Sequence, residues 1–175
     1  TILENVVLGL EITKTLNLST RSYVIKLLET YGLAEFKDKY LGQLSGGMKQ
    51  RVSVARAFAN DPEILLMDEP FGALDEQNRI ILQQEILRIW EGTKKTTVFI
   101  THSIDEALCL GDRILVMTAH PGTIKTIVDI DLPRPRDIAS IRTTLRYNEL
   151  FQTIWLHLRE EVLKVKAQEL GTLNE

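Results

Sequence analysis

The stretch EILLMDEP, residues 63–70, indicates which class of fold this chain adopts. Ile64 to Met67 are all apolar and do not alternate with polar residues. That pattern is typical of a strand covered on both faces, as in a parallel sheet. The stretch TTVFIT at 96–101 predicts a second buried strand, and a helical pattern separates the two. Strands that alternate with helices predict an α/β domain with a mostly parallel central sheet.

Apolar periodicity predicts the other elements. Helices are expected over 3–12, 20–31, 46–59, 76–91 and 103–111, and a long one over roughly 144–170. Their apolar faces are predicted to hold Val24, Leu27, Leu28 and Tyr31 in the second helix, Ile80, Ile81, Gln84, Leu87 and Trp90 in the fourth, and Leu150, Ile154, Leu158, Val162 and Val165 in the last. Strands over 112–118 and 123–132 are expected to pair as a hairpin around His120-Pro121-Gly122.

The order of these elements predicts three parts of the chain. Residues 1–45 form a small helical subdomain that continues into the helix 46–59. Residues 60–136 form a sheet-containing core, and residues 137–175 form a C-terminal helical extension. A chain of 175 residues is long enough to bury a sizeable core.

Composition narrows the class of protein. Hydrophobic residues make up 44% and charged residues 26% of the chain, which is typical of a soluble globular protein. A net charge of −3 does not favour nucleic acid as a partner. The single cysteine, Cys109, excludes an internal disulfide and is expected to be a packed core residue. No apolar run approaches the ~20 residues of a membrane span.

The carboxylates that follow the first strand are candidate catalytic residues. Asp68 and Glu69 stand at the carboxyl end of that strand, and open α/β sheets bind ligands at this edge. One carboxylate can hold Mg²⁺, directly or through water. The next can orient or deprotonate a water for attack on a phosphoryl group. The alternative is a strand that ends in an ordinary polar turn.

A second candidate is LSGGMKQR, residues 44–51, at the start of the helix 46–59. Amide groups at a helix start have no partner within the helix, and together with the helix dipole they favour an anion. Gly46 and Gly47 would let a phosphate reach the backbone, and the Ser45 hydroxyl adds a donor. The alternative is that Ser45 is a simple N-cap, which leaves the two adjacent glycines unexplained.

Two further polar residues follow these stretches. His102 comes directly after the second strand, where it can donate a hydrogen bond to a phosphate near Glu69; the alternative is an ordinary surface histidine. Asp75 precedes the helix 76–91, and we expect it to be the N-cap of that helix as well as a site residue. Ser103 with Glu106 three residues later predicts a capping box.

The order of these motifs resembles the ATPase domain of ATP-binding cassette (ABC) proteins. LSGGMKQR resembles the ABC signature motif, and ILLMDEP resembles a Walker B motif with its catalytic glutamate. ALD at 73–75 is similar to the D-loop, and THS at 101–103 is similar to the switch histidine. TILENVVLGLEI at 1–12 resembles the helical segment after the Q-loop. TAHPGTIKTIVDIDLPRPRD at 118–137 resembles importers of nitrate, sulfonates, taurine and similar small anions.

The resemblance implies a partial P-loop NTPase fold, with 60–136 as the C-terminal part of a RecA-like core, and ATP and Mg²⁺ as cofactors. Glu69 would polarise the attacking water, His102 would contact the γ-phosphate, and Asp68 would hold Mg²⁺ through water. The residues expected to contact the ATP of a partner subunit are Leu44, Ser45, Gly46, Gly47, Met48 and Gln50. Asp75, in the D-loop, would couple the two sites of the dimer.

The same resemblance implies partners and a location. Two ATPase subunits form a homodimer at the cytoplasmic face of the cell membrane and dock on transmembrane permease subunits. Residues 1 to about 45 would touch the permease. A periplasmic or lipid-anchored solute-binding protein would act on the complex indirectly, and no nucleic acid is expected.

The sequence contains no P-loop motif, G-x-x-x-x-G-K-[ST]. In ABC ATPases that loop lies upstream of the segment that residues 1–12 of this chain resemble. We therefore expect the chain to be the C-terminal two-thirds of such a domain and to hydrolyse no ATP alone. One alternative is a non-catalytic ABC-like interaction module. Another is a soluble ABC-type ATPase of DNA repair, which would carry long heptad-rich coiled coils that this sequence lacks.

Overall fold

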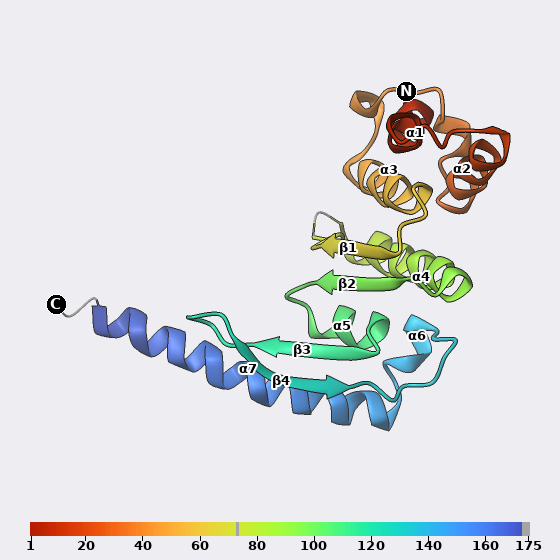
Figure 1. The fold of residues 1–175 in the computed structure, drawn as a ribbon. Helices are drawn as coiled ribbons and strands as arrows, with labels where there is room; N and C mark the ends of the chain where they lie inside the picture. The colour runs from red at the N-terminus through yellow and green to blue at the C-terminus, as the bar shows by residue number, and fades with distance from the viewer. Residues whose placement is uncertain (73, 173–175) are drawn as a thin grey trace. The chain divides into compact units, whose positions relative to one another are not determined.

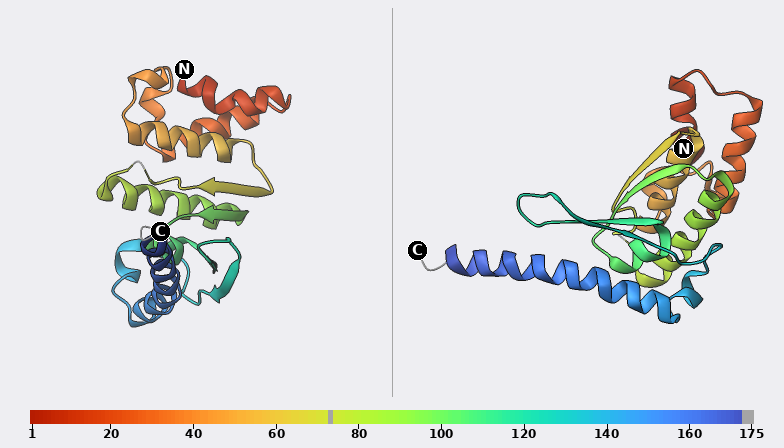
Figure 2. Two further views of the ribbon diagram at one scale, coloured as in Figure 1. Left: turned by 90° about the vertical axis from the view of Figure 1, so that its left-hand side faces the viewer. Right: turned by 60° about the horizontal axis from the view of Figure 1, so that its bottom comes forward.

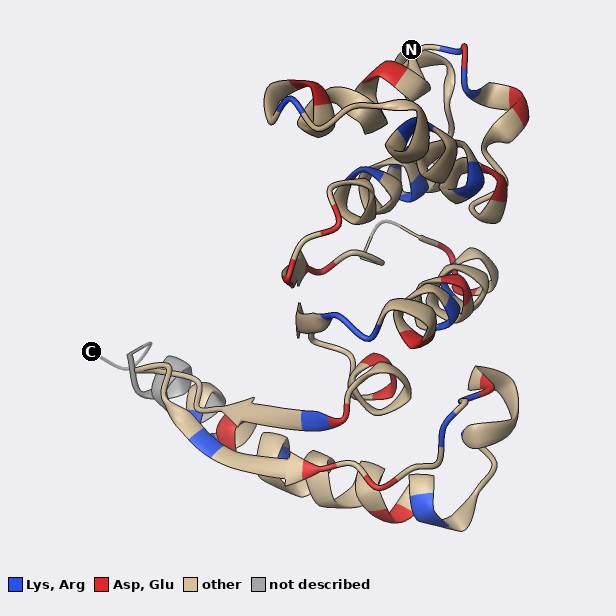
Figure 3. Cartoon of the chain, turned by 45° about the vertical axis from the view of Figure 1, so that its right-hand side comes forward, with Lys and Arg blue, Asp and Glu red and all other residues tan. Residues whose placement is uncertain are grey.

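The computed structural model describes residues 1–72 and 74–172, with side chains as far as residue 165 (Figures 1 and 2). The chain forms two compact units, Thr1–Ile100 and Thr101–Glu175. Acidic and basic residues are interspersed along both units (Figure 3). In the described part of the chain, no helix combines the length and the apolar character that a bilayer crossing requires. The division into 1–45, 60–136 and 137–175 stays a prediction.

The first unit begins with helices around α3. They are α1 (Ile2–Ile12), α2 (Leu18–Thr30), the 3-10 turns η1 (Ala34–Phe36) and η2 (Leu41–Gln43), and α3 (Gly46–Ala59), with α1 and α2 both packed on α3. Thr1 forms a capping box with Glu4 at the start of α1. Gly32 takes a φ of +64° just after α2, a conformation that glycine adopts at little cost. The predicted face of α2 is buried as expected: Val24, Leu27, Leu28 and Tyr31.

The second half of this unit is β1 (Ile64–Asp68), α4 (Glu76–Thr93) and β2 (Thr96–Ile100), and β1 and β2 pair in parallel. Both strands are therefore where the sequence predicts them. The prediction that both faces of these strands are buried is wrong: Leu65 is 4% exposed, but Leu66 is 73% exposed. In the described residues of the first unit the sheet consists of these two strands, and no other element of that unit covers its second face.

The predicted apolar face of α4 is also largely wrong. The residues that α4 buries are Leu82, Gln83, Ile86 and Leu87, and of the five predicted residues only Leu87 is among them. Ile81 is half exposed. The physical reason is that Gln83 is fully buried, so a pattern based on apolar residues alone assigns the wrong side of the helix to the core.

The second unit contains α5 (Ile104–Leu110), β3 (Arg113–Met117), β4 (Ile124–Asp129), α6 (Ile138–Ile141) and α7 (Leu145–Thr172). β3 and β4 pair in an antiparallel hairpin, as predicted. α7 packs against α5 and β3. Leu150 and Ile154 are buried on α7 as expected, whereas Val162 is half exposed. Cys109 is fully buried, which raises the pKa of its thiol.

Arg136 holds the carboxyl end of α5. Its side chain is 2% exposed and donates to the carbonyl oxygens of Leu108, Cys109 and Gly111, at distances of 3.2, 3.2 and 2.7 Å. These groups lie where a helix runs out of amide partners. Arg134 adds a bond of 2.9 Å to the carbonyl of Leu110. The PRPRD segment thus anchors one end of the short helix that follows His102.

Candidate functional site

The start of α3 carries the first group of candidate residues. Ser45 is the N-cap, and its hydroxyl accepts a hydrogen bond of 3.3 Å from the amide of Met48. The carbonyl of Ser45 accepts the first bond of the helical ladder, from Lys49 at 3.0 Å. The amide groups of Gly46 and Gly47 belong to the first turn, where a helix provides them no acceptor. Ser45 therefore has the capping role that the sequence indicated.

The surroundings of the two glycines bear on why they are there. A Cβ built on Gly46 meets no atom within 4 Å, and on Gly47 it lies 3.3 Å from Cδ2 of Leu74. Neither residue has a positive φ. Neither backbone conformation nor packing against the described chain requires glycine at position 46. The bare backbone at this position instead leaves open space in front of the helix.

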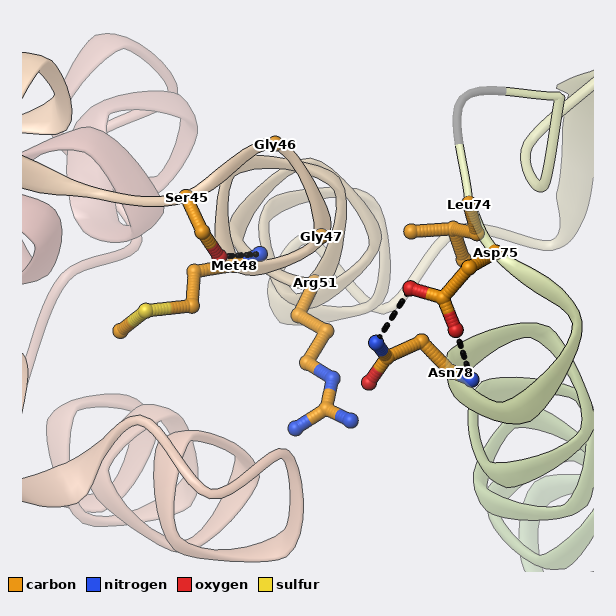
Figure 4. Close-up of a pocket in the computed structure, with 8 residues that line it drawn as sticks. All are labelled: Ser45, Gly46, Gly47, Met48, Arg51, Leu74, Asp75 and Asn78. Carbon is orange, nitrogen blue, oxygen red and sulfur yellow. Dashed lines mark hydrogen bonds between the residues drawn. The ribbon is translucent and has the colours of Figure 1, made fainter.

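One pocket joins the starts of α3 and α4 (Figure 4). It has a volume of about 350 Å³. The residues that line it are Ser45, Gly46, Gly47, Met48, Arg51, Leu74, Asp75 and Asn78. Of the predicted signature residues, Leu44 and Gln50 do not line it, and Leu44 is buried in the core. Two stretches 30 residues apart in the sequence thus share one cavity.

Asp75 forms the opposite wall of the pocket. It is the N-cap of α4, as predicted, and its carboxylate accepts bonds from the amide of Asn78 at 3.0 Å and from Nδ2 of Asn78 at 2.7 Å. These hydrogen bonds from Asn78 hold the pKa of Asp75 below its ordinary value. The carboxylate therefore stays ionised at the pocket. Ala73, the first residue of the ALD stretch, lies outside the described residues.

Three lining residues are not among the individually predicted site residues: Arg51 and Leu74, which lie in the stretches LSGGMKQR and ALD, and Asn78. Arg51 follows Gly47 by four residues and so shares its helix face. Its guanidinium also donates to the carbonyl of Tyr31, at 3.4 Å, where α2 ends. Asn78 is the third residue after the N-cap Asp75, the position that faces a capping side chain. Helical spacing from the motif residues is the signal that points to both.

Asp68 and Glu69 stand at the end of β1, and neither lines the pocket. Both are exposed. Glu69 has a φ of +42°, uncommon for a residue with a side chain, and its amide donates to the carbonyl of Ile100 at 2.9 Å. The chain therefore turns sharply at the glutamate. A Cβ on Gly72 would lie 3.7 Å from Oε2 of Glu69, so this turn brings the carboxylate back over the following residues.

The carboxylates at the end of β1 can supply only part of a magnesium site. In the residues that the structure describes, no three His, Cys, Asp or Glu side chains gather closely enough to hold a metal ion. Asp68 offers one exposed carboxylate. Mg²⁺ commonly keeps several waters and uses one or two carboxylates with substrate phosphates, so a single carboxylate is compatible with it.

His102 lies in the second unit, in the segment before α5. Its approach to Glu69 stays a prediction. The residues on either side of it are firmly bonded. Ser103 is the N-cap of α5, and its hydroxyl accepts from the amide of Glu106 at 3.4 Å. The Ser103 amide donates to Oγ1 of Thr101 at 3.0 Å, and that hydroxyl donates to Oε2 of Glu106 at 2.5 Å. The predicted capping box is therefore wrong in one of its two bonds: the Ser103 amide donates to the Thr101 hydroxyl instead of to the Glu106 side chain.

Comparison with known proteins shows which fold this chain shares. Residues 1–72 match the family model described as ABC transporter. A dimeric post-hydrolysis structure of the ATP-binding cassette MJ0796, bound to ADP and Pi, superposes with a TM-score of 0.56 and is 36% identical, covering 66% of this chain and 51% of that one. The chain therefore has the α/β fold of an ABC ATPase domain, a P-loop NTPase fold.

Individual relatives carry more specific names than the family model. An uncharacterized ABC transporter ATP-binding protein of Methanocaldococcus jannaschii is 52% identical over 94% of this chain and 60% of that protein. A taurine import ATP-binding protein of Rhizobium johnstonii is 42% identical over 92% of this chain and 64% of that protein. The chain thus spans somewhat over half the length of these relatives. Together the matches support an ABC transporter ATP-binding domain.

Proposed function

We propose that this chain belongs to the ATP-hydrolysing subunit of an ABC importer for a small anion such as nitrate, a sulfonate or taurine. Two kinds of support bear on the proposal. The relatives include proteins named for taurine import. The pocket in front of α3 joins the signature stretch to Asp75. In this proposal, hydrolysis of ATP drives transport through a separate permease.

The observation that carries the proposal is the open space at Gly46, which nothing in the described chain explains. In the proposal, the first-turn amides of α3 and the Ser45 hydroxyl meet the γ-phosphate of an ATP that a second subunit holds. A hydrogen bond to a charged group contributes about 1.5–3 kcal/mol, so a few such bonds cannot hold ATP alone after the costs of association. They can close over a nucleotide that is already bound elsewhere.

The remaining residues have distinct proposed roles. Bound ATP supplies the phosphoryl group that is transferred to water, and Mg²⁺ offsets its charge. Glu69 orients and polarises the attacking water, and Asp68 accepts hydrogen bonds from the water shell of the metal. His102 donates to the γ-phosphate. Asp75, which hydrogen bonds from Asn78 hold ionised, couples the two ATP sites of the dimer.

The proposed assembly is a homodimer of ATPase subunits on the cytoplasmic face of the membrane. A structural relative that is 36% identical is a dimer, which favours this assembly. The helices of residues 1–45 would contact transmembrane permease subunits. A periplasmic or lipid-anchored solute-binding protein would select the solute and act indirectly. No nucleic acid takes part.

The test uses a chimera, in which a P-loop-containing segment of an ABC ATPase precedes Thr1. We expect Mg²⁺-dependent ATP hydrolysis by the chimera, reduced at least ~100-fold by Glu69→Gln, because loss of a positioned general base typically costs this much. Size-exclusion chromatography should show that Glu69→Gln still dimerises with ATP. Full hydrolysis in the Glu69→Gln variant would contradict the role of Glu69. A folded chimera that binds ATP without hydrolysing it would favour the non-catalytic alternative.

A mixing experiment tests whether the signature residues act across the dimer. One variant of the chimera loses its P-loop lysine, and the other carries Ser45→Arg, which fills the pocket. Each is expected to be inactive alone. Mixed dimers contain one site with an intact P-loop and an intact signature stretch from opposite subunits, so part of the activity should return. Two variants that are each inactive alone and stay inactive when mixed would contradict action of Ser45 across the dimer.

A further inference from the structure

The segment that carries His102 is enclosed by a short ring of hydrogen bonds. Thr101 donates its hydroxyl to Glu106, and the amide of Ser103 donates to the same hydroxyl. The amide of Glu106 in turn donates to the hydroxyl of Ser103. None of these bonds uses the imidazole of His102. These hydrogen bonds therefore fix the residues before and after the histidine, and the His102 side chain takes no part in them.

We propose that Glu106 is a positioning residue for His102. Its carboxylate holds the Thr101 hydroxyl, the hydroxyl holds the Ser103 amide, and the backbone of the loop 101–103 is thereby fixed on α5. This sets the direction in which the His102 side chain leaves the loop. The inference rests on the proposed function, in which that side chain donates to a γ-phosphate. A donor aimed in advance needs no reorganisation when the charge develops.

The burial of Glu106 supports more than a capping role. Its side chain is 6% exposed. Taking a carboxyl group out of water is costly unless hydrogen bonds compensate for the lost hydration. A helix cap needs only the bond from the Glu106 amide to Ser103 and can leave the carboxylate in solvent. Here the carboxylate is buried and holds the hydroxyl of Thr101, the residue directly before His102.

The other end of α5 has its own anchor. Arg136 binds three carbonyl groups at the end of this helix. We therefore expect α5 to stay attached when the contacts at its first turn are removed. For this reason a substitution at Glu106 should loosen the loop 101–103 without releasing the helix. That separation makes the proposal testable in the 175-residue chain itself.

The first experiment is NMR on the histidine rings and backbone amides of this chain. It has three histidines, so single His→Gln variants assign the ring signals of His102, His120 and His157. In Glu106→Ala the His102 ring and Ser103 amide signals should shift and broaden, and exchange of the Ser103 amide with solvent should speed up at least ~10-fold. The rings of His120 and His157 should keep their positions.

Three further variants separate positioning from stability. Glu106→Gln keeps an oxygen that accepts from Thr101, so it should preserve the His102 signals. Thr101→Val removes the relay hydroxyl at almost constant shape, so it should cause the same changes in the His102 and Ser103 signals that we expect for Glu106→Ala. It provides the test if the alanine variant does not fold. Asp105→Asn is the matched control, because Asp105 lies on the same turn but accepts from the hydroxyl of Tyr147. It should leave the His102 signals unchanged. Unmoved His102 and Ser103 signals in Thr101→Val and Glu106→Ala would overturn the proposal.

The second experiment measures hydrolysis in the chimera. Glu106→Ala should lower kcat about 10-fold with KM for ATP within about twofold, and Glu106→Gln should restore it. Because Glu106 acts through His102, the double variant with His102→Ala should be no slower than His102→Ala alone. If His102→Ala leaves hydrolysis intact, the role of the histidine in the proposed function fails, while the NMR result still decides whether Glu106 positions it. A double variant slower than both single variants would contradict action through His102.

Discussion

At the scale of single residues, a substitution at Gly46 is expected to raise stability and to lower ATP hydrolysis. Glycine within a helix is less stable than alanine by roughly 0.5–1 kcal/mol, and a Cβ at position 46 meets no atom. We expect Gly46→Ala to raise the free energy of unfolding by about 0.5 kcal/mol, measured by urea denaturation of this chain. In the chimera the same methyl group should lower ATP hydrolysis, because it stands where the phosphate is proposed to approach.

Gly92 provides the matched control for this prediction. It also lies in a helix, near the end of α4, and a Cβ there also meets no atom within 4 Å. Gly92→Ala should raise stability by a similar amount and leave hydrolysis unchanged. Equal hydrolysis in the Gly46→Ala and Gly92→Ala chimeras would mean that the bare backbone at 46 serves no ligand.

The residues of the pocket show how far a motif can be predicted from sequence. Ser45 to Met48 and Asp75 could be picked out because their residue types suit helix starts, which is a local property. Arg51 and Asn78 were missed, although they lie at helical spacing from Gly47 and Asp75. Which side chains share a cavity depends on where the fold places the starts of α3 and α4, and no local pattern encodes that placement.

At the scale of elements, the β3–β4 hairpin is tied to α7 by an ion cluster. Lys125 donates to Glu160 at 2.6 Å, to Glu161 at 2.8 Å and to the carbonyl of His157 at 2.9 Å. Glu161 also accepts from the Ala119 amide in the hairpin, at 3.3 Å. Hydrogen bonds from Lys125 and then Lys164 lower the pKa of Glu161 to about 2. The carboxylate is thus held ionised in the folded state.

This cluster predicts a stability that depends on pH. A glutamate has a pKa of about 4.3 in an unfolded chain, so its contribution is complete above pH ~5 and is lost as pH falls toward ~2. Glu161→Gln should lower Tm at pH 7 by a few degrees, and its Tm should fall less than that of the unchanged chain over this acid range. The fluorescence of Trp155 on α7, in a Trp90→Phe background, reports the transition.

Glu149→Gln is the control for the cluster. Glu149 pairs with Arg146 on the same helix, and both side chains are half exposed. Exposed pairs contribute little, so this change should alter Tm at pH 7 by about a degree or less. A Glu161→Gln variant whose Tm runs parallel to that of the unchanged chain at every pH would contradict the assigned role of the cluster.

Element positions could be predicted well because capping residues and periodicity act locally. The starts of α3 and α5 follow from Ser45 and Ser103, each of which accepts a hydrogen bond from the first turn. α1 begins one residue earlier than the predicted helix 3–12, because Thr1 caps it. The buried side of α4 could not be predicted in this way. Its central residue Gln83 is polar by type and fully buried in fact, so only the packed structure reveals which face points inward.

At the scale of the whole molecule, the largest error of sequence reasoning concerns the sheet. The continuous apolar pattern predicts strands covered on both faces, but the structure leaves one face of β1 and β2 exposed. The residues exposed on that face are Ile64, Leu66, Val98 and Ile100. The composition of a strand shows that both of its faces suit a core. It does not show whether this chain supplies a second layer.

The exposed face predicts the behaviour of the 175-residue chain in solution. Leu65 and Leu66 are adjacent leucines on opposite faces of β1, at 4% and 73% exposure, and so form a matched pair. Leu66→Thr should change the free energy of unfolding by no more than about 0.5 kcal/mol. It should also increase the monomer fraction in size-exclusion chromatography, since exposed apolar sheet faces favour association. Leu65→Thr should cost about 2–4 kcal/mol, because it empties a packed site and buries a hydroxyl. A loss of similar size at both positions would mean that the second face is covered in solution, and the one-sided sheet would then be wrong.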